Sequence, residues 1–170
     1  MSTFLLSVVI STTCAISTPT IDDQDVTHAI NMMTKELIAR HDALLCWEEE
    51  HAEGWLSKHE GGTTAIATLA LLASGESING DELQQSLQYL WEIEHPSTYV
   101  LSIRTSIWSL LPKRFERRLK KDTKRLIATM GASCGGWGNG ARPPTSLKGA
   151  SPLVRQFGMN ALREAGRNGV

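Results

Sequence analysis

The segment Asp22-Asp23-Gln24-Asp25 places three carboxylates within four residues of this 170-residue chain. Neighbouring carboxylates can act as a general acid when one of them is kept protonated by the others. The same residues directly precede a helical pattern, where acidic side chains cap the first turn and interact favourably with the helix dipole. Capping accounts for these residues without any catalysis, and we expect that role.

A second group, His51-Ala52-Glu53 followed by His59-Glu60, offers imidazole and carboxylate groups to a metal ion. A zinc deaminase would also need Pro-Cys-x-x-Cys, and a metalloprotease would need His-Glu-x-x-His. Neither pattern occurs. Adventitious metal binding by His51 and His59 stays open as an alternative, but we expect a solvated loop. We therefore assign no catalytic residue, no cofactor and no metal site.

The chain has three cysteines, at positions 14, 46 and 134. Cys46 and Cys134 could form a disulfide in an oxidising compartment. The alternative is that both are small buried apolar residues. Their positions in the sequence do not show that they lie near each other.

Residues 1–18 contain an apolar stretch at 4–10 that is too short to span a bilayer. The stretch fits the apolar region of a secretory signal, with Thr13-Cys14-Ala15 as a loose cleavage site, although no Lys or Arg precedes it. Residues Ser11-Thr12-Thr13 are a poor approach to a lipidated cysteine. We expect a signal peptide and an exported protein, periplasmic or extracellular. The alternative is an apolar leader on a cytoplasmic protein, and in neither case do we expect a transmembrane helix.

The composition is that of an ordinary globular domain, with 41% hydrophobic and 21% charged residues and a net charge of −1. Two Tyr, three Phe and six Pro argue against a β-sandwich. Charge is unevenly distributed, because residues 22–60 hold ten acids and three bases while residues 113–125 hold eight bases and two acids. We interpret the basic run as the solvated face of a helix. Docking to anionic lipid, nucleic acid or an acidic partner, including a second copy of the chain, is the alternative.

From residue 22 onward, amphipathic and apolar helical patterns alternate three times. The first amphipathic stripe has apolar residues at spacings of three and four, and comprises Val26, Ile30, Met33, Leu37, His41 and Leu44. Apolar helices are expected at 63–75 and 98–111, and amphipathic helices at 81–95 and 113–130. A last helix is expected at 151–166, with Pro152 in its first turn. Gly54-Trp55 recurs as Gly136-Trp137, a spacing of about twice 41, and such a period indicates a stacked array of helix pairs.

Three segments carry a resemblance to a known superfamily: GGWGNG at 135–140, VRQFGMNALREAG at 154–166 and TTAIATLALLASG at 63–75. The chain resembles the α/α toroid of squalene cyclases and protein prenyltransferases, and especially the toroid-like N-terminal region of larger exported bacterial proteins. The resemblance implies an all-α fold in which residues 22–170 form about three helical hairpins of an incomplete, open toroid. It also implies structural repeat loops at Gly54, Trp55, Gly135, Gly136, Trp137 and Gly138.

The sequence lacks the residue patterns with which that superfamily carries out its chemistry. A squalene-type cyclase would need Asp-x-Asp-Asp on an inner helix, and a prenyltransferase would need an Asp, Cys and His set for zinc; neither occurs. We expect a non-catalytic binding or scaffold module that is part of a larger protein. Its partner would be another protein or the missing C-terminal part of the same protein, and nucleic acid is not expected. The alternatives are an isoprenoid- or terpenoid-handling enzyme with unrecognised active residues, and a basic-surface binder of nucleic acid or anionic lipid.

Overall fold

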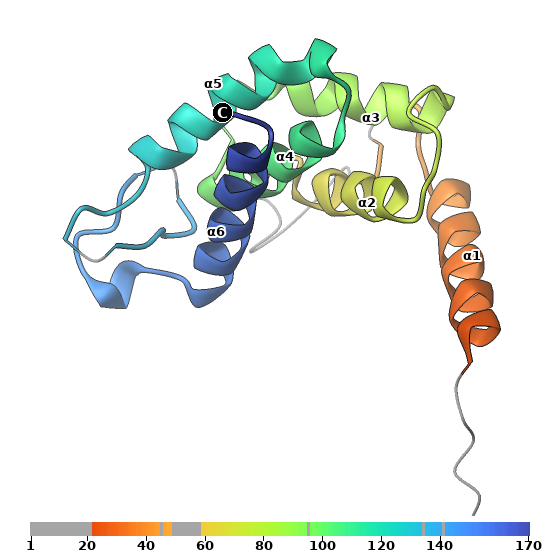
Figure 1. The fold of residues 1–170 in the computed structure, drawn as a ribbon, viewed down its shortest axis with the longest axis horizontal. Coiled ribbons are helices and arrows are strands. Elements are labelled where there is room, and N and C mark those ends of the chain that lie inside the picture. Colours follow the sequence, from red (N-terminus) through yellow and green to blue (C-terminus); the bar gives the residue numbers. More distant parts are fainter. Residues whose placement is uncertain (1–21, 45, 49–58, 95, 134, 141) are drawn as a thin grey trace, which may run out of the picture.

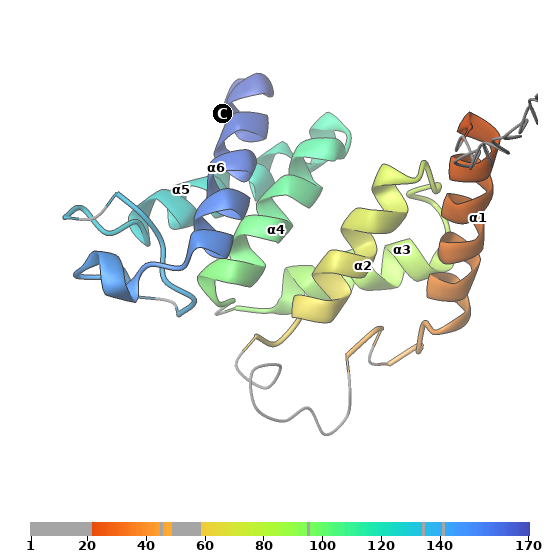
Figure 2. The ribbon, with the colours of Figure 1, turned by 90° about the horizontal axis from the view of Figure 1, so that it is seen from below.

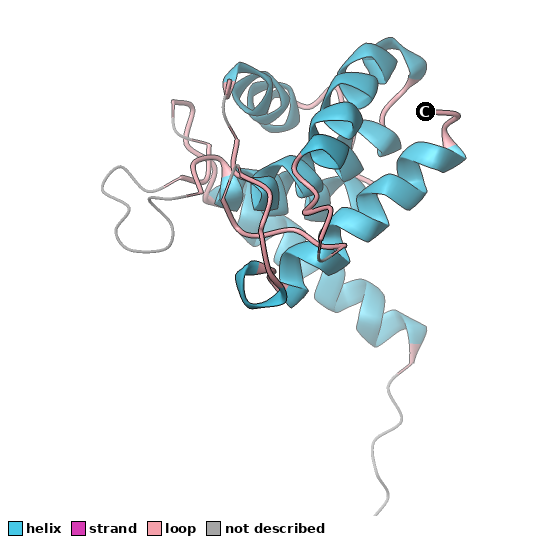
Figure 3. Cartoon of the chain, turned by 90° about the vertical axis from the view of Figure 1, so that its left-hand side faces the viewer, coloured by secondary structure: helices cyan, strands magenta, loops and turns pink. Residues whose placement is uncertain are grey.

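The computed structural model describes residues 22–170, with gaps at 45, 49–58, 95, 134 and 141. All regular structure in these residues is helical, apart from two isolated β-bridges (Figure 3), so the all-α prediction is confirmed. The α-helices are α1 (Asp23–Ala39), α2 (Gly62–Ala73), α3 (Asp81–Glu92), α4 (Thr98–Leu110), α5 (Glu116–Ala128) and α6 (Pro152–Arg167). Two short 3-10 helices, η2 (Lys113–Phe115) and η3 (Leu147–Gly149), lie before and after α5.

The helices form two layers. Helices α2, α4 and α6 lie in one row, with α4 in the middle, and α3 and α5 cover that row on its other side (Figures 1 and 2). Helix α1 stands next to α2 at one end of the molecule, whereas the loop between α5 and α6 lies at the opposite end. Within the part of the chain that the structure describes, no helix has both the length and the apolar character needed to cross a membrane.

Helix α4 is the centre of the core, and every residue from 98 to 109 except Ser106 is buried. Its sequence allows burial all round because its polar residues are mostly Ser and Thr, whose hydroxyls bond to carbonyls of the preceding turn. Ser102 Oγ donates to Tyr99 O at 2.7 Å, and Thr105 Oγ1 donates to Leu101 O at 2.8 Å. These bonds satisfy the hydroxyls without a partner from another helix.

Most helix ends follow from local sequence, as expected. The Asp22 carboxylate accepts hydrogen bonds from the backbone N–H groups of Gln24 and Asp25 at 2.8 Å, and Asp25 bonds back to the backbone of Asp22. This capping box confirms the structural role of the acidic run. Ser97 and Ser151 cap α4 and α6 in the same way, through their side-chain oxygens.

The first amphipathic helix differs from its prediction in two respects. It ends at Ala39 rather than continuing through His41 and Leu44, and Leu44 is 86% exposed. Its apolar stripe is also largely uncovered, since Ile30 is 39% and Met33 60% exposed. Only the C-terminal part of the stripe is covered, where Leu37 and Ile38 pack against a cluster that includes Trp47 and residues of α2.

The helix pairs are unequal, in contrast to the expected period near 41. They begin at Asp23, Asp81 and Glu116, because long connections join α1 to α2 and α5 to α6, while residues 93–97 alone join α3 to α4. A common feature nevertheless marks the three pairs. In α1, α3 and α5 the carbonyl of the third-last residue accepts a side-chain N–H from the segment that follows: Leu37 O from Trp47, Leu90 O from Arg104 and Leu126 O from Trp137, at 2.7 to 2.8 Å.

Candidate functional site: the basic groove between α3 and α5

The basic residues of α5 lie on one side of the helix, next to its core-facing stripe. The core stripe is Leu119, Asp122 and Leu126, which are all buried. Six basic residues of η2 and α5 adjoin it at spacings of three and four, namely Arg114, Arg117, Arg118, Lys121, Lys124 and Arg125, whereas Lys120 of α5 pairs with Glu116. This periodicity predicts one continuous charged face, because side chains three and four residues apart are neighbours on a helix.

Four of these cations, Arg114, Arg118, Lys121 and Arg125, line the boundary between α5 and α3. We call this boundary the α3/α5 groove. It contains two hollows, of about 590 Å³ and 380 Å³. Among the described residues, none of the four cations is within ion-pair distance of a carboxylate. The groove therefore presents positive charge that the fold itself does not neutralise.

Aromatic rings form the floor of the groove and hold its central arginine. The Arg118 guanidinium lies 4.3 Å from the ring centre of Trp91 and 5.3 to 5.4 Å from the ring centres of Phe115 and Trp108. Trp108 and Phe115 are stacked, with ring planes 8° apart. Cation–π contact of this kind orients a guanidinium without neutralising it. Burial lowers the pKa of Arg118 from its ordinary value, but a guanidinium stays protonated at neutral pH.

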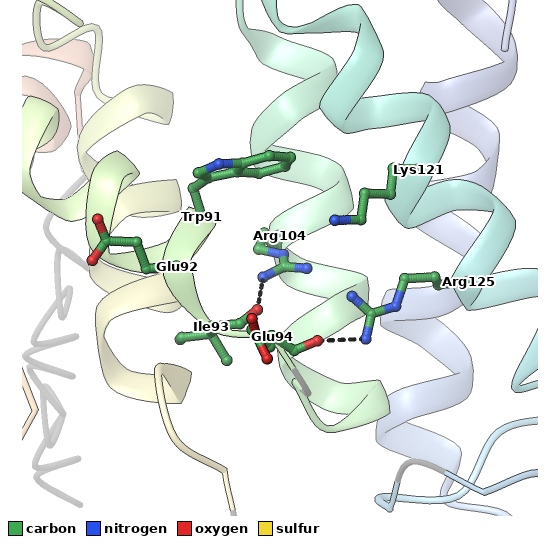
Figure 4. Close-up of a pocket in the computed structure, with 7 residues that line it drawn as sticks. All are labelled: Trp91, Glu92, Ile93, Glu94, Arg104, Lys121 and Arg125. Carbon is green, nitrogen blue, oxygen red and sulfur yellow. Dashed lines mark hydrogen bonds between the residues drawn. The ribbon is translucent and has the colours of Figure 1, made fainter.

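The larger hollow lies beside the C-terminal end of α3 (Figure 4). Arg125 Nη2 donates to Glu94 O at 2.8 Å, and the Lys121 ammonium lies 4.9 Å from the ring centre of Trp91. In Figure 4 the Lys121 ammonium points into the space between Trp91 and Arg125. Glu92 and Glu94 also line the hollow, but the Glu92 carboxylate points away from Lys121 and Arg125 (Figure 4).

A buried polar network behind the floor fixes the positions of α3, α4 and α5. Arg104 makes two bonds to the Asp122 carboxylate, Nε to Oδ2 at 2.6 Å and Nη2 to Oδ1 at 2.8 Å. Trp108 Nε1 donates to the same Oδ2 at 2.8 Å. Arg104 Nη1 also donates to Leu90 O and Ile93 O at the end of α3. The bidentate pair gives the groove a defined width, because it ties one wall to the other through α4.

The predicted repeat-loop residues 135–138 lie away from this groove. Trp137 is 2% exposed and packs between α5 and α6, where its ring faces Gly158 and its Nε1 donates to Leu126 O at 2.8 Å. Gly135 has a φ of +57°, and a Cβ on Gly138 would approach the carbonyl oxygen of Gly149 to 2.9 Å. Gly136 is buried beside the guanidinium of Arg155.

Gly54 and Trp55 lie outside the described residues, so their part of the prediction has no structural account. Among the described residues it is Trp47 that corresponds to Trp137. Each follows an isolated bridge, Asp42 with Cys46 or Gly131 with Gly136, and each bonds to the outer helix before it. Sequence comparison missed Trp47 because its flanking residues, Leu45-Cys46, do not match Gly135-Gly136.

The other candidates from the sequence form no metal site as far as the structure describes them. His59 is buried and its Nδ1 lies 2.8 Å from Ser97 Oγ, so the expectation of a solvated loop is wrong for this residue. His51 lies outside the described residues, and no cluster of three or more metal-ligating side chains occurs within them. Cys46 is a buried free thiol whose pKa is raised by burial. Cys134 is another residue that the structure does not describe.

Sequence reasoning found the basic run but not the groove. Trp91 and Trp108 come from α3 and α4, and only tertiary packing brings them under Arg118. Comparisons of the chain with protein families, with curated proteins and with solved structures find no match. The groove must therefore be interpreted from its own chemistry.

Proposed function

We propose that this chain is a non-catalytic helical-repeat binding module that holds an acidic segment of a protein partner in the α3/α5 groove. One observation carries the proposal: four cations line the groove, they have no carboxylate partner among the described residues, and aromatic rings fix the central one. Cationic side chains that are held in place but have no carboxylate partner bind anionic groups whose spacing matches their own. Little side-chain entropy is lost in such binding, because the cations are already ordered.

The other residues of the groove favour a polypeptide over a nucleic acid. Gln84 and Gln88 line its α3 side, where their amide groups can pair with a peptide backbone. Glu94 lines the larger hollow, and its charge would repel a continuous phosphate backbone. An acidic peptide can place a basic or neutral residue of its own opposite this carboxylate.

The fold is consistent with a toroid-like array of the squalene cyclase and prenyltransferase type that lacks the chemistry of that superfamily. The two layers of alternating helices support this part of the proposal. The carboxylates that most resemble a cyclase acid, those of Asp22 and Asp25, accept hydrogen bonds from the backbone in a helix cap. Cleavage of residues 1–18 during export belongs to the same proposal, and N-terminal sequencing of the mature protein tests it.

Fluorescence anisotropy of a labelled, glutamate-rich peptide tests binding in the groove. Lys121→Glu reverses a groove charge, and we expect it to weaken binding about tenfold, the equivalent of roughly 1.4 kcal/mol. Lys35→Glu is the matched control, because it makes the same charge change on the exposed surface of α1. The affinity should also fall with added salt.

Two results would contradict the proposal. Equal effects of the two substitutions would mean that the peptide senses only net charge and has no defined site. Tighter binding of a single-stranded oligonucleotide with the same number of charges would favour the nucleic-acid alternative over a protein partner.

A further inference from the structure

The side of the molecule formed by α1 and α2 has an uncovered apolar surface, which we call the α1/α2 groove. It contains two hollows of about 220 Å³ and 280 Å³. Its lining is almost entirely apolar and includes Ile30, Met33, Leu37, Ile66 and Ala70. Met33 on α1 is 60% and Ile66 on α2 is 47% exposed, and contiguous exposed apolar surface of this kind marks an interaction site.

An internal repeat shows which kind of element fits this groove. Residues 34–39, TKELIA, match residues 123–128, TKRLIA, at all positions but one. Each segment ends an outer helix, each leucine carbonyl accepts the N–H of a following tryptophan, and in both copies the next helix begins fifteen residues after that tryptophan. The pair α1/α2 is therefore equivalent to the pair α5/α6.

The two copies differ in what covers them. In the C-terminal copy, α4 packs against both α5 and α6 and buries Leu119 and Asp122 to 2% and 0% exposure. The equivalent residues on α1 are Ile30 and Met33, which are 39% and 60% exposed. The α1/α2 groove is therefore equivalent to the surface of α5 and α6 that α4 covers. A further helix, in line with α2, α4 and α6, would fit into it.

The opposite end of the molecule offers such a helix. Helix α6 ends the row (Figure 2), and its surface exposes two large apolar side chains, Leu153 at 51% and Met159 at 61%. The two ends also differ in charge. Residues 142–170, which include α6, hold five bases and one acid, whereas residues 22–60 hold ten acids and three bases. The charge at one end therefore complements the charge at the other.

We propose that copies of this chain associate head to tail, with α6 of one copy seated in the α1/α2 groove of the next. This surface is separate from the α3/α5 groove, so the inference does not depend on the proposed function. Because the two contacting surfaces are different, the contact is heterologous and builds an open chain or a closed ring rather than a symmetric dimer. The row of helices α2, α4 and α6 would continue from copy to copy.

Sedimentation velocity of the full chain over a range of concentrations tests the proposal. We expect the average mass to rise with concentration at low salt and to fall when salt is added, since salt screens the attraction between the ends. Met33→Glu should keep the protein monomeric by placing a charge in the groove, and Met159→Glu should do so by altering α6. Met32→Glu is the matched control, because Met32 is 56% exposed and lies outside the lining of the groove.

Mixing the two blocked variants distinguishes a head-to-tail contact from other arrangements. Met33→Glu keeps an intact α6 surface and Met159→Glu keeps an intact groove, so their mixture should form a one-to-one dimer and nothing larger. No dimer in the mixture would overturn the proposal, as would a wild-type chain that stays monomeric at every concentration. A large fall in the melting temperature of monomeric Met33→Glu would also overturn it, because the groove would then be filled by another segment of the same chain. In each case peptide binding by the α3/α5 groove can be measured separately.

Discussion

Replacing Asp122 by leucine would remove the acceptor of three buried donors at the centre of the molecule. The carboxylate accepts hydrogen bonds from Arg104 Nε and Nη2 and from Trp108 Nε1 at 2.6 to 2.8 Å, and the side chains of Arg104 and Asp122 are 2% and 0% exposed. Breaking a buried ion pair by removing one partner costs about 3–5 kcal/mol, because the other charge is left in the core without compensation.

That cost is a large part of the stability of a domain, which is typically about 5–15 kcal/mol. At about 2–4 °C per kcal/mol for a chain of this size, the melting temperature should fall by roughly 6–20 °C. Circular dichroism during urea and thermal unfolding measures both quantities. Glu116→Gln is the control, since it breaks an exposed ion pair with Lys120 and should leave the melting temperature unchanged.

The double variant Arg104→Met/Asp122→Leu separates loss of a partner from loss of the network. Replacing both charges by apolar side chains removes the uncompensated guanidinium, so the double variant should be more stable than Asp122→Leu alone. The reasoning would be refuted if Asp122→Leu cost less than about 1 kcal/mol, well below the cost of stranding a buried charge. A double variant no more stable than the single one would refute it as well.

Three further predictions concern packing, pH and reactivity. Gly158→Ala places a Cβ 2.9 Å from the Trp137 ring and should destabilise the protein by about 1–3 kcal/mol in urea unfolding, whereas an unchanged midpoint would mean that the ring is free to move. Burial raises the pKa of Tyr89 to about 12 and also raises that of Tyr99. The stability that these two neutral phenols contribute should be fully present below pH 10 and be lost as the pH rises through their pKa values in the folded protein. Tyrosinate absorbance that rises at pH 10 in the native protein would contradict this. Cys46, with its raised pKa, should react with a thiol reagent only on unfolding in a variant that lacks the other two cysteines, and rapid labelling of the native protein would show that the site is open.

The helices could be predicted from the sequence because their signals are local. Ser97, Ser151 and the Asp22 capping box mark helix starts through bonds to backbone groups within three residues. The buried character of α4 was also predictable, since its sequence is largely apolar. The same periodicity misled for α1, because a stripe shows that a helix could be covered and does not show that a covering element is present.

The groove could not be predicted because its parts are distant in the sequence. The basic run of α5 was apparent, but the sequence does not reveal that Trp91 and Trp108 meet Arg118. The buried state of Asp122 was hidden for a similar reason. In the sequence it stands among lysines and arginines as one more exposed charge, and its partner Arg104 lies on another helix.

The carbonyl bonds of Leu37, Leu90 and Leu126 have a consequence for how such a protein can change over evolutionary time. The acceptor in each bond is a main-chain atom, so any amino acid at that position can supply it. The donor is tryptophan in two of the helix pairs and arginine in the third. Related chains could therefore lose almost all sequence identity and still keep a buried side-chain N–H bonded to the end of each outer helix.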